Sequence, residues 1–226
     1  MTSSDRLALA LFTLTGLTGV IDAVSFLGLG RVFTANMTGN VVLLGFAVAG
    51  APGLSITRHA VSLVAFLVGA VAGGYIGHSM AGGSRHRWLR TAGLGEAALL
   101  CAAALASMGV AGVVEIPTIR TYAVIALTAV AMGLRNATVQ RLAVPDLTTT
   151  ILTRTLTGIA ADSSLAGGEN ARIGRRLLSV VVMFAGAVIG TLLLRHGLAL
   201  PLTLSAMCVL AATYAAVPAS PPAANH

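Results

Sequence analysis

Residues 31–46 read RVFTANMTGNVVLLGF, and the interpretation of the whole sequence starts from this stretch. Its second half is apolar enough to lie in a lipid bilayer, whereas its first turns carry Thr34, Asn36, Thr38 and Asn40. Hydrocarbon offers such side chains no hydrogen-bond partners, so they usually face a protein interior or a wet cavity. The stretch therefore predicts a short membrane-embedded helix with a polar head.

A second stretch of the same kind lies in the other half of the chain, where residues 146–163 read DLTTTILTRTLTGIAADS. In this stretch Thr149 and Thr153 stand where Thr34 and Thr38 stand in the first, and Arg154 replaces a glycine. Short polar segments in corresponding positions of two halves are a sequence pointer to a transport site.

The composition indicates an all-α integral membrane protein. Of the chain's residues 56% are hydrophobic and only 9% are charged, against about 25% charged in a soluble domain. The 226 residues can supply six to eight crossings of about 20 residues each. The apolar runs are continuous, without the alternation of a β-barrel. We therefore expect residues 1–226 to form one transmembrane domain.

Three short matches between the halves predict an internal duplication. GVIDA (19–23) corresponds to GLRNA (133–137), TANMT (34–38) to TTILT (149–153), and GAVAG (69–73) to GAVIG (186–190). The matches occur in the same order and at nearly the same offset, as internal repeats do. The sequence thus predicts repeat one at 7–114, repeat two at 119–217 and a disordered tail at 218–226.

The distribution of arginine predicts the topology. If residues 33–49 and 147–163 enter the membrane and return, nine arginines lie on one side and four on the other. The nine are Arg6, Arg85, Arg87, Arg90, Arg135, Arg141, Arg172, Arg175 and Arg176. The positive-inside rule favours this division, which gives six full spans, two short polar helices and cytoplasmic termini. The alternative is eight spans, since a short helix can cross where the bilayer thins.

The two motifs around these segments, GVIDAVSFLGLGRVFTANMTGNVVLLG and GLRNATVQRLAVPDLTTTILTRTLTG, resemble the YoaK-type family of uncharacterised bacterial membrane proteins. The resemblance covers nearly the whole chain. Arg154 departs from the family pattern, in which a small residue is expected. The resemblance implies a multi-pass protein of the bacterial inner membrane, and it implies no particular activity, substrate or catalytic residue.

Asp22 is the most informative single residue, because a carboxylate inside a membrane helix is costly and usually has a role. It could be a proton or cation relay, or the fixed partner of an arginine or of helix N–H groups. Arg154 could bind an anionic solute or neutralise Asp22. We expect the polar heads of the two short segments to face each other inside the bundle. The candidate substrate-binding residues are Asp22, Asn36, Thr38, Asn40, Asn136, Thr149, Thr153, Arg154 and Thr157.

These features predict a small transporter or permease for a small polar or ionic solute. The alternative is a non-transporting membrane scaffold or assembly partner, because the glycines at 69, 73 and 77 are typical of helix-packing seams. The sequence carries no GxSxG, HExxH, P-loop or CxxC motif, so we expect no enzyme, no metal and no cofactor. The expected partners are the lipid bilayer and a solute, without nucleic acid; a homo-oligomer remains open.

Overall fold

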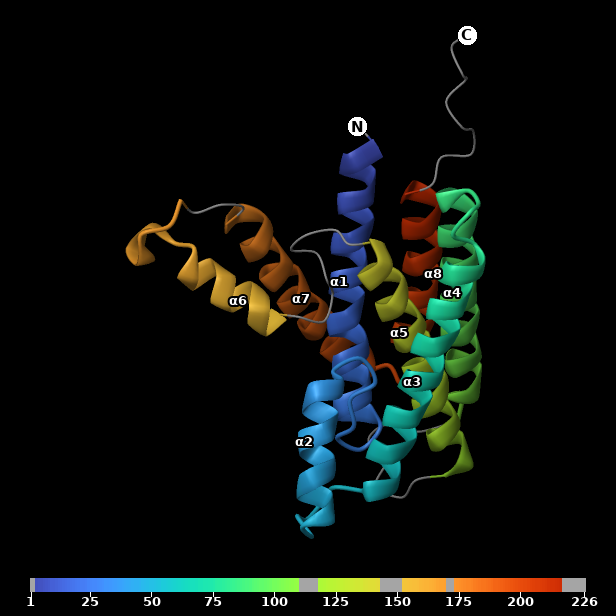
Figure 1. Ribbon diagram of the computed structural model, residues 1–226. Coiled ribbons are helices and arrows are strands. Elements are labelled where there is room, and N and C mark those ends of the chain that lie inside the picture. The colour runs from blue at the N-terminus through green and yellow to red at the C-terminus, as the bar shows by residue number, and fades with distance from the viewer. Residues whose placement is uncertain (1–2, 110–117, 143–151, 170–172, 217–226) are drawn as a thin grey trace.

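The computed structural model describes residues 3–109, 118–142, 152–169 and 173–216, and every regular element in these ranges is a helix (Figure 1). Six of the helices are long and apolar enough to cross a membrane. These are α1 (Ser3–Gly28), α3 (Ile56–Ser79), α4 (Arg85–Ala106), α5 (Ile119–Leu142), α7 (Ile173–Leu194) and α8 (Ala199–Ala216). The shorter elements are α2 (Met37–Val48), α6 (Leu152–Ala161) and a 3₁₀ turn at Ser164–Ala166. The predicted bundle of six spans and two short helices is confirmed. The tail at 218–226 lies outside the described residues.

The six long helices alternate in direction, so the start of α1 and the end of α8 lie at the same end of the bundle (Figure 1). Helices α1 and α5 are the most buried of the six, and α3 and α7 are the most exposed. The core combines side chains such as Ile21, Leu100, Met132 and Leu202, none more than 1% exposed. The exposed sides of α3 and α7 are apolar, as lipid contact requires.

The segment predicted as a helix at 33–49 is in fact a buried loop followed by a short helix. Gly30 and Arg31 have φ angles of 86° and 61°, and this left-handed backbone ends α1. The loop continues to Asn36, whose side chain accepts the backbone N–H of Gly39 at 3.2 Å and so caps α2. Only 12 residues remain helical, about 18 Å against a hydrocarbon core of about 30 Å.

The two flanks of this segment are neighbours, so the segment returns to the side from which it enters. A Cβ atom placed on Gly53 would lie 3.3 Å from Nη1 of Arg31. Nη1 of Arg58, in the first turn of α3, donates to the carbonyl of Gly30 at 3.4 Å. The alternative of eight spans is therefore wrong for residues 33–49. Helix α6 has only 10 residues, while the part of 147–163 before residue 152 lies outside the described ranges.

Cysteine labelling should confirm this return. We expect single cysteines replacing Arg31 and Pro52 to react with a membrane-impermeant thiol reagent from the same side. A cysteine replacing the exposed Ser84, at the opposite end of the bundle, is the control and should react only from the other side. Cys101 and Cys208 are first replaced by alanine. Labelling of the positions of Arg31 and Pro52 from opposite sides would contradict the fold.

Glycines line the two closest helix contacts, as their spacing predicts. Helix α3 packs against α5, and α1 packs against α7. A Cβ atom on Gly73 would lie 2.8 Å from the carbonyl oxygen of Leu134, and one on Gly190 would lie 2.8 Å from that of Val20. Backbones therefore approach each other directly at both contacts, where a larger residue has no room.

Candidate functional site

The loop between α1 and α2 is buried inside the membrane domain. Val32, Thr34 and Ala35 are at most 2% exposed. Side chains from two helices bind the loop backbone at Phe33: Oδ1 of Asn40 accepts its N–H at 3.2 Å, and Oγ of Ser62 donates to its carbonyl at 2.6 Å. Irregular backbone survives at membrane depth only where protein satisfies it or water reaches it. These side chains therefore hold the loop in place.

Asp22 holds the other end of this loop from α1. Its side chain is buried, and the backbone N–H groups of Ala35 and Asn36 interact with its carboxyl group. Oδ1 of Asp22 has no hydrogen-bond partner among the described residues. The sequence left open whether an arginine or backbone N–H groups would be the partner of Asp22. The structure shows backbone N–H groups, and Oδ1 of the carboxyl group has no described partner.

Three further polar atoms around the loop are buried without a partner in the described part of the chain: Oγ1 of Thr34, Nδ2 of Asn40 and Nε2 of His59. His59 is completely buried, and its Nδ1 lies 2.7 Å from the carbonyl oxygen of Ser55. An unsatisfied buried polar group costs about 1–3 kcal/mol, so such atoms are expected to meet water, an ion or a solute. We call Asp22, Thr34, Asn40 and His59 the loop cluster.

Sequence reasoning missed His59, although a signal was present. His59 and Ser62 lie one helical turn apart on α3, so they share a face. Ser62 binds Phe33, which also binds Asn40. Two polar residues at this spacing at the start of an apolar helix are a pattern that predicts a polar contact. The pattern therefore predicts that this face of α3 packs against the polar head of the re-entrant segment.

The expectation that the polar heads of the two short helices face each other in the interior is wrong. Asn36 and Thr38 are exposed, and so are the described members of the second set, Thr153, Arg154 and Thr157. Thr149 lies outside the described residues.

Helix α6 has no buried residue and packs on α7. There Arg176 donates to the carbonyl of Gly158 and to Asp162, each at 2.6 Å, so contacts to its own neighbours hold α6 outside the core (Figure 1).

Asn136 is half-buried, and its Nδ2 donates to the carbonyl of Met132 at 2.9 Å, within its own helix. Of the nine predicted residues, Asp22 and Asn40 therefore belong to the loop cluster. A role in solute binding stays a prediction for all nine residues.

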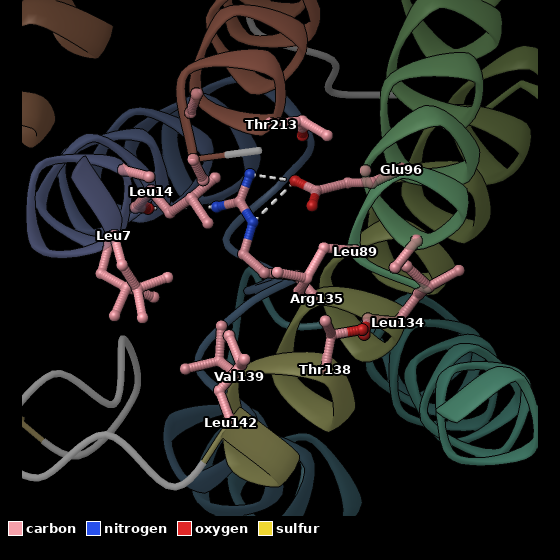
Figure 2. A pocket seen from close by; sticks show the side chains of 16 residues that line it. Leu7, Leu14, Leu89, Glu96, Leu134, Arg135, Thr138, Val139, Leu142 and Thr213 are labelled. Carbon is pink, nitrogen blue, oxygen red and sulfur yellow. Dashed lines mark hydrogen bonds and ion pairs between the residues drawn. The ribbon is translucent and has the colours of Figure 1, made fainter. Parts of the chain in front are cut away.

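The alternative in which Arg154 neutralises Asp22 is also wrong, because Asp22 is buried and Arg154 is exposed. In the described part of the chain, a buried ion pair joins Arg135 on α5 to Glu96 on α4, and their side chains are 1% and 5% exposed. Nε of Arg135 donates to Oε1 of Glu96 at 2.6 Å, and Nη2 contacts the same oxygen (Figure 2). Nη1 donates to the carbonyl of Leu14 at 3.2 Å and to Oγ1 of Thr18 at 3.3 Å.

Arg135 is therefore a membrane-embedded residue and not part of a cytoplasmic connector. Without it, the predicted division of nine arginines against four becomes eight against four. The positive-inside rule still favours the same orientation. The sequence signal for the pair was two opposite charges inside apolar runs, which usually find each other because an unpaired charge there is costly.

A small cavity lies beside this ion pair, between α1, α4, α5 and α8. Its volume is about 60 Å³, and Glu96 and Arg135 are the charged residues in its lining. Apolar side chains such as Leu7, Leu89 and Leu142 form most of the rest (Figure 2). The protein thus combines a buried ion pair next to a cavity with a polar cluster around a re-entrant loop.

The fold and these two features define a class: a multi-pass helical membrane protein with six candidate crossings and a re-entrant segment. Residues 10–215 match the family described as "Protein of unknown function (DUF1275)", and the chain belongs to this family. It is also similar to the UPF0700 transmembrane protein YoaK of Bacillus subtilis (strain 168), with 28% identity over 156 residues.

This alignment covers 69% of the chain and 66% of the relative, slightly less than two thirds of the relative's length. No solved structure matches the chain. The family and the relative confirm the resemblance and the multi-pass membrane character predicted from the sequence.

Proposed function

We propose that the protein is a small transporter or permease for a small polar or ionic solute. The observation that carries this proposal is the loop cluster, in which four buried side chains at an irregular loop each carry one polar atom without a described partner. Many secondary transporters bind their substrates where helices are broken inside the membrane, because free backbone and side-chain groups meet there. Asp22 offers an acceptor and Asn40 a donor, a combination that suits a small polar molecule, and the carboxylate of Asp22 also suits a cation.

The proposal includes two inverted repeats, 7–114 and 119–217, as the moving parts. In this arrangement α1 corresponds to α5 and α3 to α7, and the members of each pair run in opposite directions (Figure 1). The contacts of Gly73 with Leu134 and of Gly190 with Val20 correspond under the same relation, and both distances are 2.8 Å. Each contact joins one repeat to the other, as expected if the repeats rock against each other.

We further propose that the protein lies in the bacterial inner membrane with both termini in the cytoplasm. The start of α1 and the end of α8 lie at one end of the bundle (Figure 1). The first turns of α4 lie at the same end and carry Arg85, Arg87 and Arg90. A surplus of arginine in short connectors supports a cytoplasmic location for that end.

Neutralising Asp22 should abolish transport. We expect proteoliposomes with the purified protein to move at least one solute of a panel of amino acids, small carboxylates, sugars and monovalent cations faster than protein-free vesicles. Asp22→Asn should lose this flux, because it removes the charge beside the loop while keeping a similar shape. Flux is measured with radiolabelled solutes.

Glu169→Gln, which neutralises an exposed carboxylate in the connector before α7, is the matched control and should retain flux. A well-folded protein that moves no member of the panel would overturn the proposal, as would an Asp22→Asn variant with undiminished flux.

A non-transporting scaffold is the second candidate, favoured by the position of α6. This helix has no buried residue and exposes Thr153, Arg154 and Thr157, so its polar face is open to a partner protein or to a second copy of the chain. Absence of flux, together with a defined oligomer by light scattering in detergent, would favour this candidate.

A further inference from the structure

The carboxylate of Glu96 is bound at one oxygen only. Both contacts from Arg135 go to Oε1, and Oε2 has no hydrogen bond to any residue that the structure describes. Figure 2 shows this second oxygen outside the two dashed contacts, and Glu96 is one of the residues that line the cavity. A carboxylate has about four acceptor positions, so the cavity is where the remaining ones can be satisfied.

The cavity is large enough for water. One water needs about 10–15 Å³ of such volume and polar partners; the cavity has about 60 Å³, and Glu96 and Arg135 are the charged groups in its lining. Its lining includes Leu7, Leu142 and Ala216, which lie near the start of α1 and the ends of α5 and α8. These ends form the side of the bundle that carries both termini (Figure 1).

We propose that this cavity gives protons access from that side to Glu96, and that the Glu96–Arg135 pair couples proton binding to the proposed transport. This inference rests on the proposed function for its purpose but not for its test. A proton that arrives from bulk solution through the cavity water binds Oε2, so Glu96 becomes neutral and the pair gains one positive charge. Arg135 on α5 then loses the counter-charge that holds its guanidinium against α4.

The next carboxylate along α1 from the present contact of the guanidinium is Asp22. Arg135 already donates to Thr18 on α1 at 3.3 Å, and Asp22 follows Thr18 by one turn on the same face, about 6 Å along the helix. The polar side chain that α8 contributes to the cavity lining is Thr213. It carries no charge and so cannot replace Glu96 as the counter-charge of Arg135. Protonation of Glu96 therefore favours movement of Arg135 toward Asp22, the residue that binds the re-entrant loop.

Carbodiimide labelling tests the proton site without any solute. Dicyclohexylcarbodiimide adds to protonated carboxyl groups in apolar surroundings and leaves a stable N-acylurea, which peptide mass spectrometry locates. We expect labelling at Glu96 that increases as the pH is lowered. Glu96→Gln should lose this label and Asp22→Asn should keep it. Because Glu96→Gln alone leaves Arg135 without a counter-charge, the double variant Glu96→Gln with Arg135→Met serves as a second unlabelled control. Absence of label at Glu96 at every pH would overturn the proposal.

Access from one side is tested with cysteines on α4. In a chain without Cys101 and Cys208, cysteine replaces either Leu89, which lines the cavity, or Leu94, which is 46% exposed on the apolar surface. A small water-soluble thiol reagent should modify the first from the side of the termini and leave the second unmodified. Equal reactivity at the two positions would contradict water in the cavity. Both tests can fail while flux persists, which would remove the proton step and leave the transporter proposal standing.

Discussion

Arg135→Met is expected to lower the free energy of unfolding by about 3–5 kcal/mol, because it leaves Glu96 buried without a counter-charge. Glu96→Gln should cost a comparable amount, since it leaves the buried guanidinium without a counter-charge. Unfolding in detergent can be followed through the fluorescence of Trp88, the single tryptophan of the chain. Each single variant should therefore unfold at clearly lower denaturant concentration than the original protein.

The double variant separates loss of the pair from loss of one partner. Replacing both members of a buried ion pair by uncharged residues of similar volume is often neutral or stabilising, so Glu96→Gln with Arg135→Met should recover most of the lost stability. The resulting double-mutant cycle gives the coupling energy between the two residues directly.

Arg154→Met is the matched control for this cycle, because it makes the same chemical change at an exposed position. Exposed substitutions of this kind usually lie within about 0.5 kcal/mol of the original stability. A large loss of stability in Arg154→Met would support the pair between Arg154 and Asp22 that the structure contradicts. Additive effects of Glu96→Gln and Arg135→Met would contradict the buried ion pair itself.

The number and type of the helices could be predicted from the sequence because they depend on local composition. Long apolar runs give the six spans, and the left-handed backbone at Gly30 together with the Asn36 cap explains why residues 33–36 are loop rather than helix. The return of this segment was predicted from the arginine distribution. The contact between Arg31 and the position of Gly53 gives that return a structural basis.

The pairing of the polar residues could not be predicted, because it depends on contacts between helices far apart in the sequence. Glu96 binds Arg135, not a residue of either short segment. The match of GLRNA with GVIDA aligns Asn136 with Asp22 and Arg135 with the apolar Ile21. Asn136 is therefore the candidate residue that this match predicts, and Arg135 is not. Both Arg135 and Arg154 lack a charged counterpart in the matched segment, yet Arg135 is buried in an ion pair and Arg154 is exposed.

Alanine at Gly69 and alanine at Gly186 should each destabilise the protein, and by similar amounts. A Cβ atom on Gly69 would meet the backbone of Val130 on α5, and one on Gly186 would meet the backbone of Gly16 on α1. Backbone atoms cannot turn aside as a flexible side chain does, so the helices must separate. Overpacking of this kind costs about 1–3 kcal/mol, which the same unfolding measurement in detergent would detect.

Gly74→Ala is the matched control, because Gly74 lies on the same helix as Gly69 with open space where its Cβ would go. Alanine has a higher helix propensity than glycine by about 1 kcal/mol, so this variant should be neutral or more stable. A harmless Gly69→Ala would contradict the close contact of α3 with α5. Because Gly69 and Gly186 occupy corresponding positions of the two proposed repeats, a large loss at one and none at the other would contradict the inverted repeat on which the rocking of the halves depends.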